Sequence, residues 1–191
     1  MSAVILHVTM SLDGFAAGPD VSPENPMGVG GLRLHEWVFG AADDEVDSKV
    51  IKELSAATGA VVLGRRTFDV GIDVWGDTPF PAACFVVTHR PQDDLAMRSG
   101  TFAFVGDGVE SAIRRARAAA GGRNVNLMGV DVARQALSAG LLDEIHLQVA
   151  PVLLGRGRRL FEEIGAGPVE LERTAVAASS RVTHLRFRVV R

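Results

Sequence analysis

The amino-acid sequence predicts an α/β fold in which helices cover both faces of a mainly parallel sheet. Short runs rich in Val, Ile and Phe alternate along the chain with segments whose apolar residues recur at helical spacing. Strands that alternate with helices need crossover connections, which make neighbouring strands parallel. Near the end of the chain, two strand-like runs follow one another without a helix between them. This change predicts an antiparallel hairpin added to the sheet.

The positions of the expected elements follow from this alternation. Strands are expected at 3–9, 60–64, 83–88, 101–105, 124–128 and 143–150. Helices are expected at 43–57 and 109–120, where apolar residues fall on one helical face. A third helix begins near Asp131 and ends at Gly140, because glycine commonly ends a helix.

The C-terminal hairpin is expected to pair 169–177 with 182–190. In the second run, apolar side chains such as Leu185 alternate with arginines such as Arg186, which is typical of a strand with one buried face. The chain has 191 residues, enough for one full core and too few for two comfortable ones. Since no linker or repeat divides the sequence, we expect a single domain over 1–191.

Composition and charge exclude several classes of partner. Apolar residues make up 47% and charged residues 23% of the chain, an ordinary globular balance. A formal charge of −3 without a basic cluster offers no general attraction for nucleic acid or membranes. The sequence shows no signal-peptide pattern and no apolar stretch long enough to span a bilayer. Its lone cysteine, Cys84, lies in an apolar run, so we expect a buried thiol and a cytoplasmic protein.

The longest region without a clear pattern is 10–42, which is rich in Gly and Pro. Loops of this length inside a compact domain usually have a function. The region also holds Trp37 and Phe39, whose large side chains must pack on something. One interpretation is a cover over a pocket, in which both rings stack on a flat heterocyclic substrate. Packing in a satellite core explains them equally well.

Three strand ends carry groups suited to phosphate. The first strand end runs through Gly64 into Arg65, Arg66 and Thr67, at the start of a helix. Backbone N–H groups at a helix start bind anions, and Arg supplies planar donors for phosphate oxygens. The alternative is a surface arginine pair beside a turn.

The second strand end carries Thr88, His89 and Arg90, a hydroxyl, an imidazole and a guanidinium that suit an adenosine phosphate. The alternative here is a solvated turn closed by Pro91. Gly108, in the turn after the strand at 101–105, gives only a weak match to a dinucleotide fingerprint.

The third strand end passes through Gly129 into Val130, Asp131, Val132 and Ala133. The functional interpretation is close approach of the backbone to a pyrophosphate. The alternative is a tight turn in which Asp131 favours the first turn of the helix. Because the carboxyl ends of parallel strands share one edge, the three ends are expected to converge on one dinucleotide. Their spare positive charge favours a 2′-phosphate, and hence NADPH over NADH.

Four stretches together resemble the dihydrofolate-reductase-like superfamily. They are 10–18 (MSLDGFAAG), 63–68 (LGRRTF), 87–91 (VTHRP) and the block 125–161, which includes GLLDEI and PVLLGRG. The resemblance is strongest to the branch containing the C-terminal reductase domain of RibD, the riboflavin-biosynthesis deaminase-reductase. This branch includes many single-domain members.

The resemblance implies a three-layer α/β/α sandwich whose central sheet has about eight strands, with NADPH across its carboxyl edge. It implies a reductase that transfers a hydride to a small heterocyclic substrate, either pterin-like or ribosylaminopyrimidine-like. The alternative is a nucleotide-binding protein of the same fold without turnover. Family members commonly pair, so a homodimer is expected.

The resemblance also implies roles for particular residues. Arg65, Arg66 and Thr67 would meet the 2′-phosphate and pyrophosphate, and the Thr88 turn would flank the adenosine. The Gly129 turn would present backbone N–H groups, and Ala16 would lie near the nicotinamide.

Asp13 is the catalytic candidate, because a carboxylate beside a closing loop can relay a proton. Its alternative role is to stabilise an Asp-Gly turn. The chain departs from the family pattern at Val130 and Asp131, where a side chain limits close approach and a carboxylate repels phosphate. It also has Ser48 where folate reductases carry an acid. Isolated histidines without carboxylates at matching spacing predict no metal site.

Overall fold

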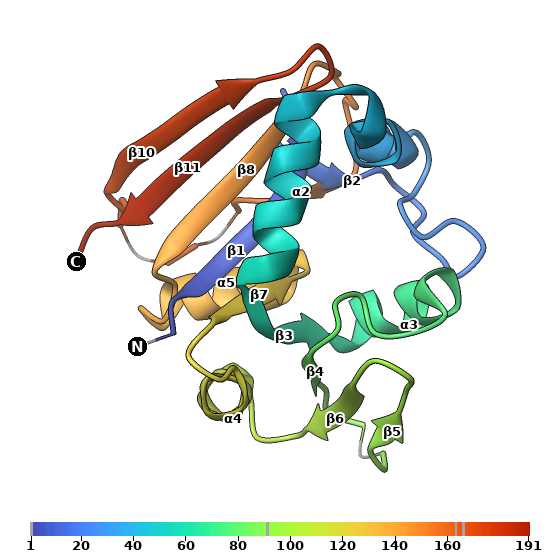
Figure 1. Ribbon diagram of the computed structural model, residues 1–191, viewed down its shortest axis with the longest axis vertical. Helices are drawn as coiled ribbons and strands as arrows, with labels where there is room; N and C mark the ends of the chain where they lie inside the picture. The colour runs from blue at the N-terminus through green and yellow to red at the C-terminus, as the bar shows by residue number, and fades with distance from the viewer. Residues whose placement is uncertain (1, 91, 163, 166) are drawn as a thin grey trace.

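The computed structural model describes residues 2–90, 92–162, 164–165 and 167–191 (Figure 1). The strands are β1 (Val4–Ser11), β2 (Phe15–Ala17), β3 (Thr58–Gly64), β4 (Ala83–Val87), β5 (Leu95–Ala96), β6 (Thr101–Val105), β7 (Asn124–Met128), β8 (Glu144–Ala150), β9 (Arg158–Arg159), β10 (Leu171–Ala178) and β11 (Thr183–Val189). The α-helices are α1 (Glu36–Phe39), α2 (Glu45–Ala57), α3 (Arg65–Trp75), α4 (Val109–Ala119) and α5 (Val130–Ser138). Short 3-10 helices span Gly31–His35 and Ala41–Asp43.

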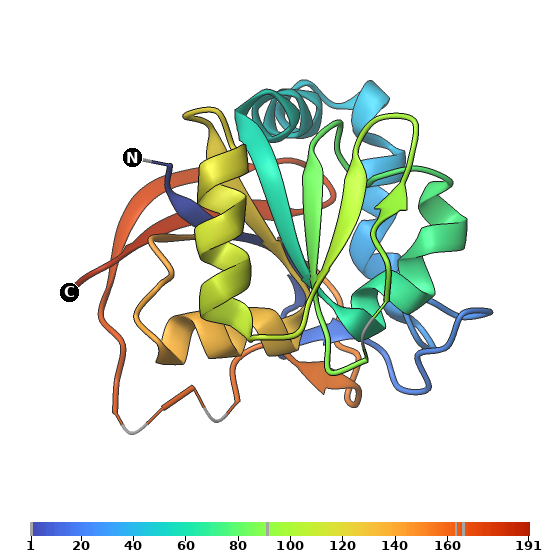
Figure 2. The same cartoon turned by 90° about the horizontal axis from the view of Figure 1, so that it is seen from below.

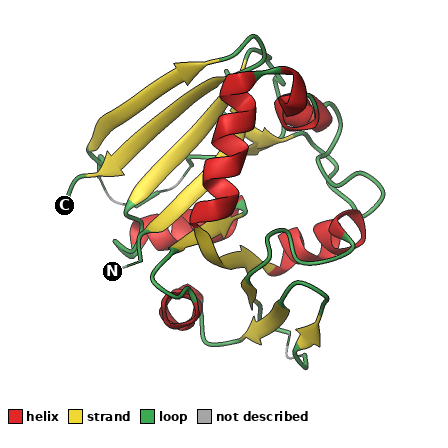
Figure 3. Cartoon of the chain, viewed as in Figure 1, coloured by secondary structure: helices red, strands yellow, loops and turns green. Residues whose placement is uncertain are grey.

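The main sheet has nine strands in the order β10-β11-β8-β1-β7-β3-β4-β6-β5. Strands β8, β1, β7, β3, β4 and β6 are parallel, while β11, β10 and β5 run antiparallel to their neighbours. Figure 3 shows the hairpin of β10 and β11 at one edge of the sheet. This architecture confirms the predicted mainly parallel α/β sheet with a C-terminal antiparallel hairpin. The sheet exceeds the expected size because the two-residue β5 extends its other edge.

Helices cover both faces of the sheet, so the chain forms three layers. Side chains of β3 alternate between the faces: Val62 belongs to a core cluster with α4 and α5, and Leu63 to a second cluster with Phe68 of α3. Helix α2 covers the same face as α3, where Val50 packs with Trp37. Figure 2 shows α4 and α5 together on the opposite side of the strands.

The register of the parallel strands places their carboxyl ends at one level. Leu63 of β3 is opposite Met128 of β7, and Gly64 is opposite Val87 of β4. Val87 is in turn opposite Val105 of β6. The turns that follow these strands therefore start side by side at the same edge of the sheet.

The region 10–42 holds more regular structure than the sequence predicts. It contains the end of β1, the short strand β2 and the helix α1, and β2 pairs with β9 through Phe15 and Arg159. Local patterns do not reveal this strand, because its partner lies far along the chain. The turn-closing role expected of Pro91 falls outside the described residues.

The structure bears on the burial of Cys84 and on the length of the apolar helices. Cys84 is fully buried, as predicted, and its burial raises the pKa of the thiol to about 12. The thiol is therefore protonated at neutral pH and is a poor nucleophile. None of the described helices combines the length and the apolar character needed to cross a bilayer.

Candidate functional site

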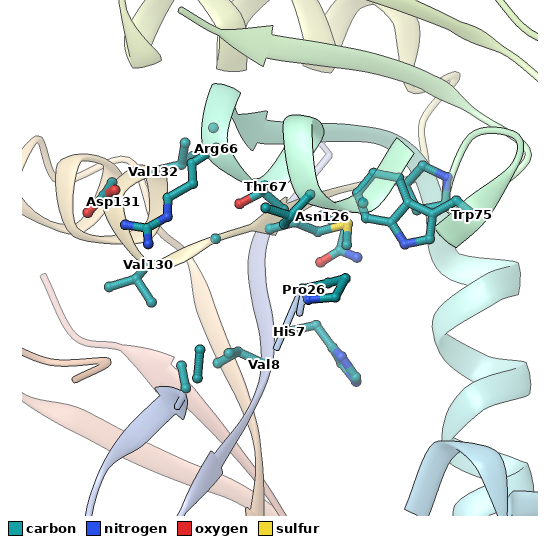
Figure 4. Close-up of a pocket in the computed structure, with 18 of the residues that line it drawn as sticks. His7, Val8, Pro26, Arg66, Thr67, Trp75, Asn126, Val130, Asp131 and Val132 are labelled. Carbon is teal, nitrogen blue, oxygen red and sulfur yellow. The ribbon is translucent and has the colours of Figure 1, made fainter. Parts of the chain in front are cut away.

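A cavity of about 870 Å³ opens at the carboxyl edge of the parallel strands. It is bounded by α2 on one side and α3 on the other, and residues of β1 and β7 form its floor. Figure 4 shows the cavity with Arg66 and Asp131 at one end and Trp75 at the other. The predicted cofactor residues that line it are Ala16, Gly64, Arg65, Arg66, Thr67, Thr88, His89, Arg90, Gly129, Val130, Asp131 and Val132.

Three helices begin at this cavity, each after a glycine. Gly64, Gly108 and Gly129 are the N-cap residues of α3, α4 and α5, and all three line the cavity. A glycine has no side chain to accept from the N–H groups of the first turn, so those donors remain available to a ligand. Gly108 is a residue that sequence reasoning set aside as a weak signal. Gly106 and Asp107 separate it from the end of β6, whereas Gly64 ends β3 and Gly129 directly follows β7.

Gly129 brings two of these turns into contact. Its φ of +98° lies in the left-handed region, which favours glycine. A Cβ at this position would lie 2.4 Å from Oγ1 of Thr67, in the first turn of α3. The turn after β7 and the start of α3 therefore pack directly against each other, and a larger residue would separate them.

The arginines of the site are held by two carboxylates. Asp69 accepts from Nε of Arg65 at 2.7 Å and from Arg90 at 2.9 Å, so one acid orients both guanidinium groups. Asp131 pairs with Arg158 of β9. This pairing offsets the negative charge of Asp131, which the sequence analysis expected to repel phosphate.

Ala133 is the predicted cofactor residue that does not reach the cavity. It is 3% exposed and belongs to the core cluster beneath α5. Its backbone N–H donates to the carbonyl of Gly129 at 3.1 Å. The first turn of the helix uses this donor, so the N–H groups left for a ligand are those of the preceding residues.

Asp13, the catalytic candidate, has a different position from the one expected. It is not among the described residues that line the cavity. Its carboxylate accepts from Ser11 Oγ and from the backbone N–H groups of Leu154 and Gly155. The Ser11 hydroxyl and these N–H groups lower the pKa of Asp13 to about 2. The carboxylate is ionised at neutral pH and has no proton to donate, so the geometry supports the turn-stabilising alternative.

The two aromatic residues predicted to contact substrate lie in different surroundings. Trp37 is 3% exposed and lines the cavity, and its Nε1–H donates to Thr9 Oγ1 at 2.9 Å. Phe39 is 72% exposed and is not among the lining residues, which corrects the expectation that it faces the substrate. Trp37 and Phe39 lie on different faces of the single turn of α1, so one points inward and the other toward solvent.

A second cavity of about 210 Å³ lies between α2 and the sheet. His146 and Gln148 of β8 line it, and Gln148 is 2% exposed. Asp47 of α2 is fully buried, and its Oδ1 lies 2.8 Å from Nε2 of His184. The carboxylate of Asp47 therefore faces β11 of the C-terminal hairpin, and Asp47 is not among the residues that line the larger cavity.

Sequence reasoning missed several residues of the larger cavity. Asn126 lies in the apolar strand β7, is 3% exposed and lines the cavity. A polar residue at a core position of a strand could have indicated a functional site. Arg158 and Trp75 gave no such signal, because their neighbours in the sequence do not show which way they point.

Within the described ranges, no group of three or more His, Cys, Asp or Glu residues is placed to hold a metal ion.

The position of Asp13 predicts a pH-dependent contribution to stability. Because its folded-state pKa is lowered to about 2, the carboxylate stabilises the fold above the ordinary Asp pKa of about 3.9 and loses this effect as the pH falls through 2. We expect Asp13→Asn to lower the melting temperature at pH 7, with a smaller difference from the unmodified chain at pH 2. Thermal denaturation at both pH values measures this. An equal melting temperature at pH 7 would contradict the structural role.

Known proteins resemble the chain in sequence family and in fold. The sequence matches the RibD C-terminal domain family over residues 2–185. No curated protein sequence matches the chain.

Among solved structures, a provisionally named riboflavin biosynthesis protein from Shewanella sp. PV-4 superposes with a TM-score of 0.76 at 20% identity, covering 99% of both chains. A pyrimidine reductase-like protein from Corynebacterium diphtheriae gives 0.64 at 17% identity, covering 100% of this chain and 92% of the other.

A larger enzyme shares the same fold in one part. The diaminohydroxyphosphoribosylaminopyrimidine deaminase/5-amino-6-(5-phosphoribosylamino)uracil reductase of Thermotoga maritima gives a TM-score of 0.67 at 14% identity. The match covers 99% of this chain and 57% of that one. These likenesses confirm the expected dihydrofolate-reductase-like fold. With the family match across nearly its whole length, the chain belongs to the RibD C-terminal domain family.

Proposed function

We propose that the chain is an NADPH-dependent oxidoreductase that reduces a small heterocyclic substrate, pterin-like or ribosylaminopyrimidine-like. The observation that carries the proposal is that three glycine-capped helix starts and a group of arginines line one cavity. Such helix starts bind anions, and the dinucleotide carries several phosphates. Membership of a reductase-domain family supports the same reaction class.

The residues present fit the cofactor by charge and by space. In the proposed arrangement, the pyrophosphate contacts the N–H groups that follow Gly64 and Gly129. Arg65, Arg66 and Arg90 hold the 2′-phosphate, with Asp69 fixing two of the guanidinium groups. When bound, the reduced nicotinamide supplies the hydride. The protein contributes orientation near Ala16. Residues of the 10–42 region that line the cavity, such as Met27 and Trp37, exclude water.

The second candidate function is nucleotide binding without turnover. The position of Asp13 favours it, because the expected proton relay is committed to Ser11, Leu154 and Gly155. Oxidation of NADPH in the presence of pterins, pyrimidines and quinones separates the two functions. Tight NADPH binding without oxidation in any of these mixtures would support the second.

The proposal extends to the state of the protein in the cell. We expect a single domain over 1–191 in the cytoplasm, acting as a homodimer on a small molecule. All eight residues of β10 are exposed, and this strand forms the free edge of the sheet. Edge strands are readily covered by another chain. Light scattering of the purified protein should give twice the mass of one chain, and a monomer at micromolar concentration would contradict the dimer.

The cofactor assignment predicts a preference for the phosphorylated dinucleotide. We expect NADPH to bind more tightly than NADH, and Arg65→Ala and Arg90→Ala each to weaken NADPH binding about tenfold, the size of one lost charge-assisted hydrogen bond. Calorimetric titration measures both. Arg188→Ala is the control, because Arg188 pairs with Glu172 on the hairpin, away from the cavity. Equal affinity for NADH and NADPH, with both variants unaffected, would refute the assignment.

The contact between Gly129 and Thr67 predicts a second effect on binding. Gly129→Ala adds a Cβ that must displace Thr67, so NADPH affinity should fall at least about tenfold. Gly140→Ala is a matched control: Gly140 also has a positive φ, +65°, and follows the other end of α5, where an added Cβ meets nothing within 4 Å. Both variants carry backbone strain, so a similar loss of affinity in the two would argue against a cofactor site at Gly129.

A further inference from the structure

The larger cavity has two halves of different chemistry. The nucleotide half holds the three helix starts and the arginines described above. The other half lies between α2 and the C-terminal part of α3, and we call it the ring half. Its apolar lining residues include Trp37, Ile51, Leu54, Val74, Trp75 and Phe80. Figure 4 shows Trp75 far from Arg66 and Asp131, with Asn126 between them.

Positive charge is confined to the nucleotide half. The arginines that line the cavity are Arg65, Arg66, Arg90 and Arg158, and the last is paired with Asp131. No described lysine lines the cavity, and none of the four residues outside the described ranges is Lys or Arg. A phosphate placed in the ring half would therefore lose its water without gaining a cation.

The histidines near the ring half do not supply the missing charge. Burial lowers the pKa of His7 to about 3, with further lowering by the nearby His146, His184 and Arg186. Burial also lowers the pKa of His35, although a backbone hydrogen bond with Gly31 opposes the change. Both imidazoles are neutral near pH 7. They offer hydrogen bonds without attracting an anion.

The wall of the ring half is shaped by a close contact on α3. A Cβ at Gly71 would lie 2.4 Å from two carbons of the Trp75 indole. The indole therefore lies directly against the backbone of its own helix, one turn back. This arrangement presents an aromatic surface to the cavity and fixes where that surface stands, which suits a planar ring.

Two polar atoms of residues that line the cavity have no hydrogen-bond partner among the described residues. Oδ1 of Asn126 is buried with no hydrogen-bond partner among the described residues, although its side chain lines the cavity. Nδ1 of His35 is in the same situation. A buried acceptor without a partner is costly, and a ligand that donates to it removes that cost. The cavity therefore favours a ring that carries an N–H or O–H group.

We propose that the substrate is an uncharged, planar ring compound that donates a hydrogen bond to Asn126 and carries no phosphate that the protein recognises. This inference rests on the proposed reductase function and narrows its substrate class. It separates this chain from a reductase whose substrate bears a phosphoribosyl group. The arginines of the cavity bind the phosphates of the nucleotide. The ring half selects the substrate by its shape and by its hydrogen bonds.

The test is binding of a matched pair to the chain saturated with NADP⁺. The pair is 5-amino-6-(5-phosphoribosylamino)uracil and the same compound without its phosphate, measured by calorimetry beside an uncharged dimethylpterin. We expect the phosphate to weaken binding at least about tenfold, and the pterin to bind as tightly as the dephosphorylated compound or more tightly. Tighter binding of the phosphorylated compound would overturn the inference. This readout does not require turnover, so failure to oxidise NADPH would overturn the proposed reductase alone.

Two variants locate the binding site in the ring half. Trp75→Ala and Asn126→Leu should each raise the Kd of the dimethylpterin at least about tenfold while the Kd of NADPH stays within about twofold. Asp73→Ala is the control, since Asp73 is an exposed residue of the same helix that does not line the cavity. Asn126→Leu keeps the branched outline of the side chain and removes its polar atoms. It provides the test if Trp75→Ala does not fold. An unchanged Kd for the pterin in Asn126→Leu would contradict the proposed contact.

Discussion

The site depends on the register of the parallel strands. Leu63 lies opposite Met128, and Gly64 opposite Val87, so the turns that follow start at one level of the sheet. A shift of one strand by one residue would reverse its faces and move its turn away from the others. The apolar side chains of β3, fully buried on both faces, hold this register. The same burial that stabilises the core therefore brings the anion-binding turns together.

Carboxylates near the phosphate-binding turns organise the arginines. Asp69 lies within 3 Å of two guanidinium groups, and Asp131 binds Arg158 from β9. A guanidinium fixed by an acid loses less conformational freedom when it meets a phosphate. The pairing also limits the excess positive charge of the site. The selectivity of the nucleotide half then depends on geometry as well as on charge.

The sequence predicted the fold class and the gathering of the turns because both follow from local patterns. Strand, glycine and helix stand next to one another at Gly64 and Gly129, and parallel topology brings them together. For Asp13 the sequence left two roles open, catalysis and stabilisation of a turn. It could not decide between them because the partners of Asp13, Leu154 and Gly155, lie more than 140 residues away. Phe39 and Trp37 look alike in the sequence, and only the orientation of α1 decides which one is buried. The sequence did not predict the ring half either, because its walls come from elements whose packing is set by tertiary contacts.

A crystal structure of the chain grown with NADPH tests the central claim most directly. It should place the pyrophosphate at the turns after Gly64 and Gly129, the 2′-phosphate beside the arginines held by Asp69, and the nicotinamide near Ala16. A dinucleotide bound elsewhere on the surface, or phosphates that contact none of these turns, would contradict the account.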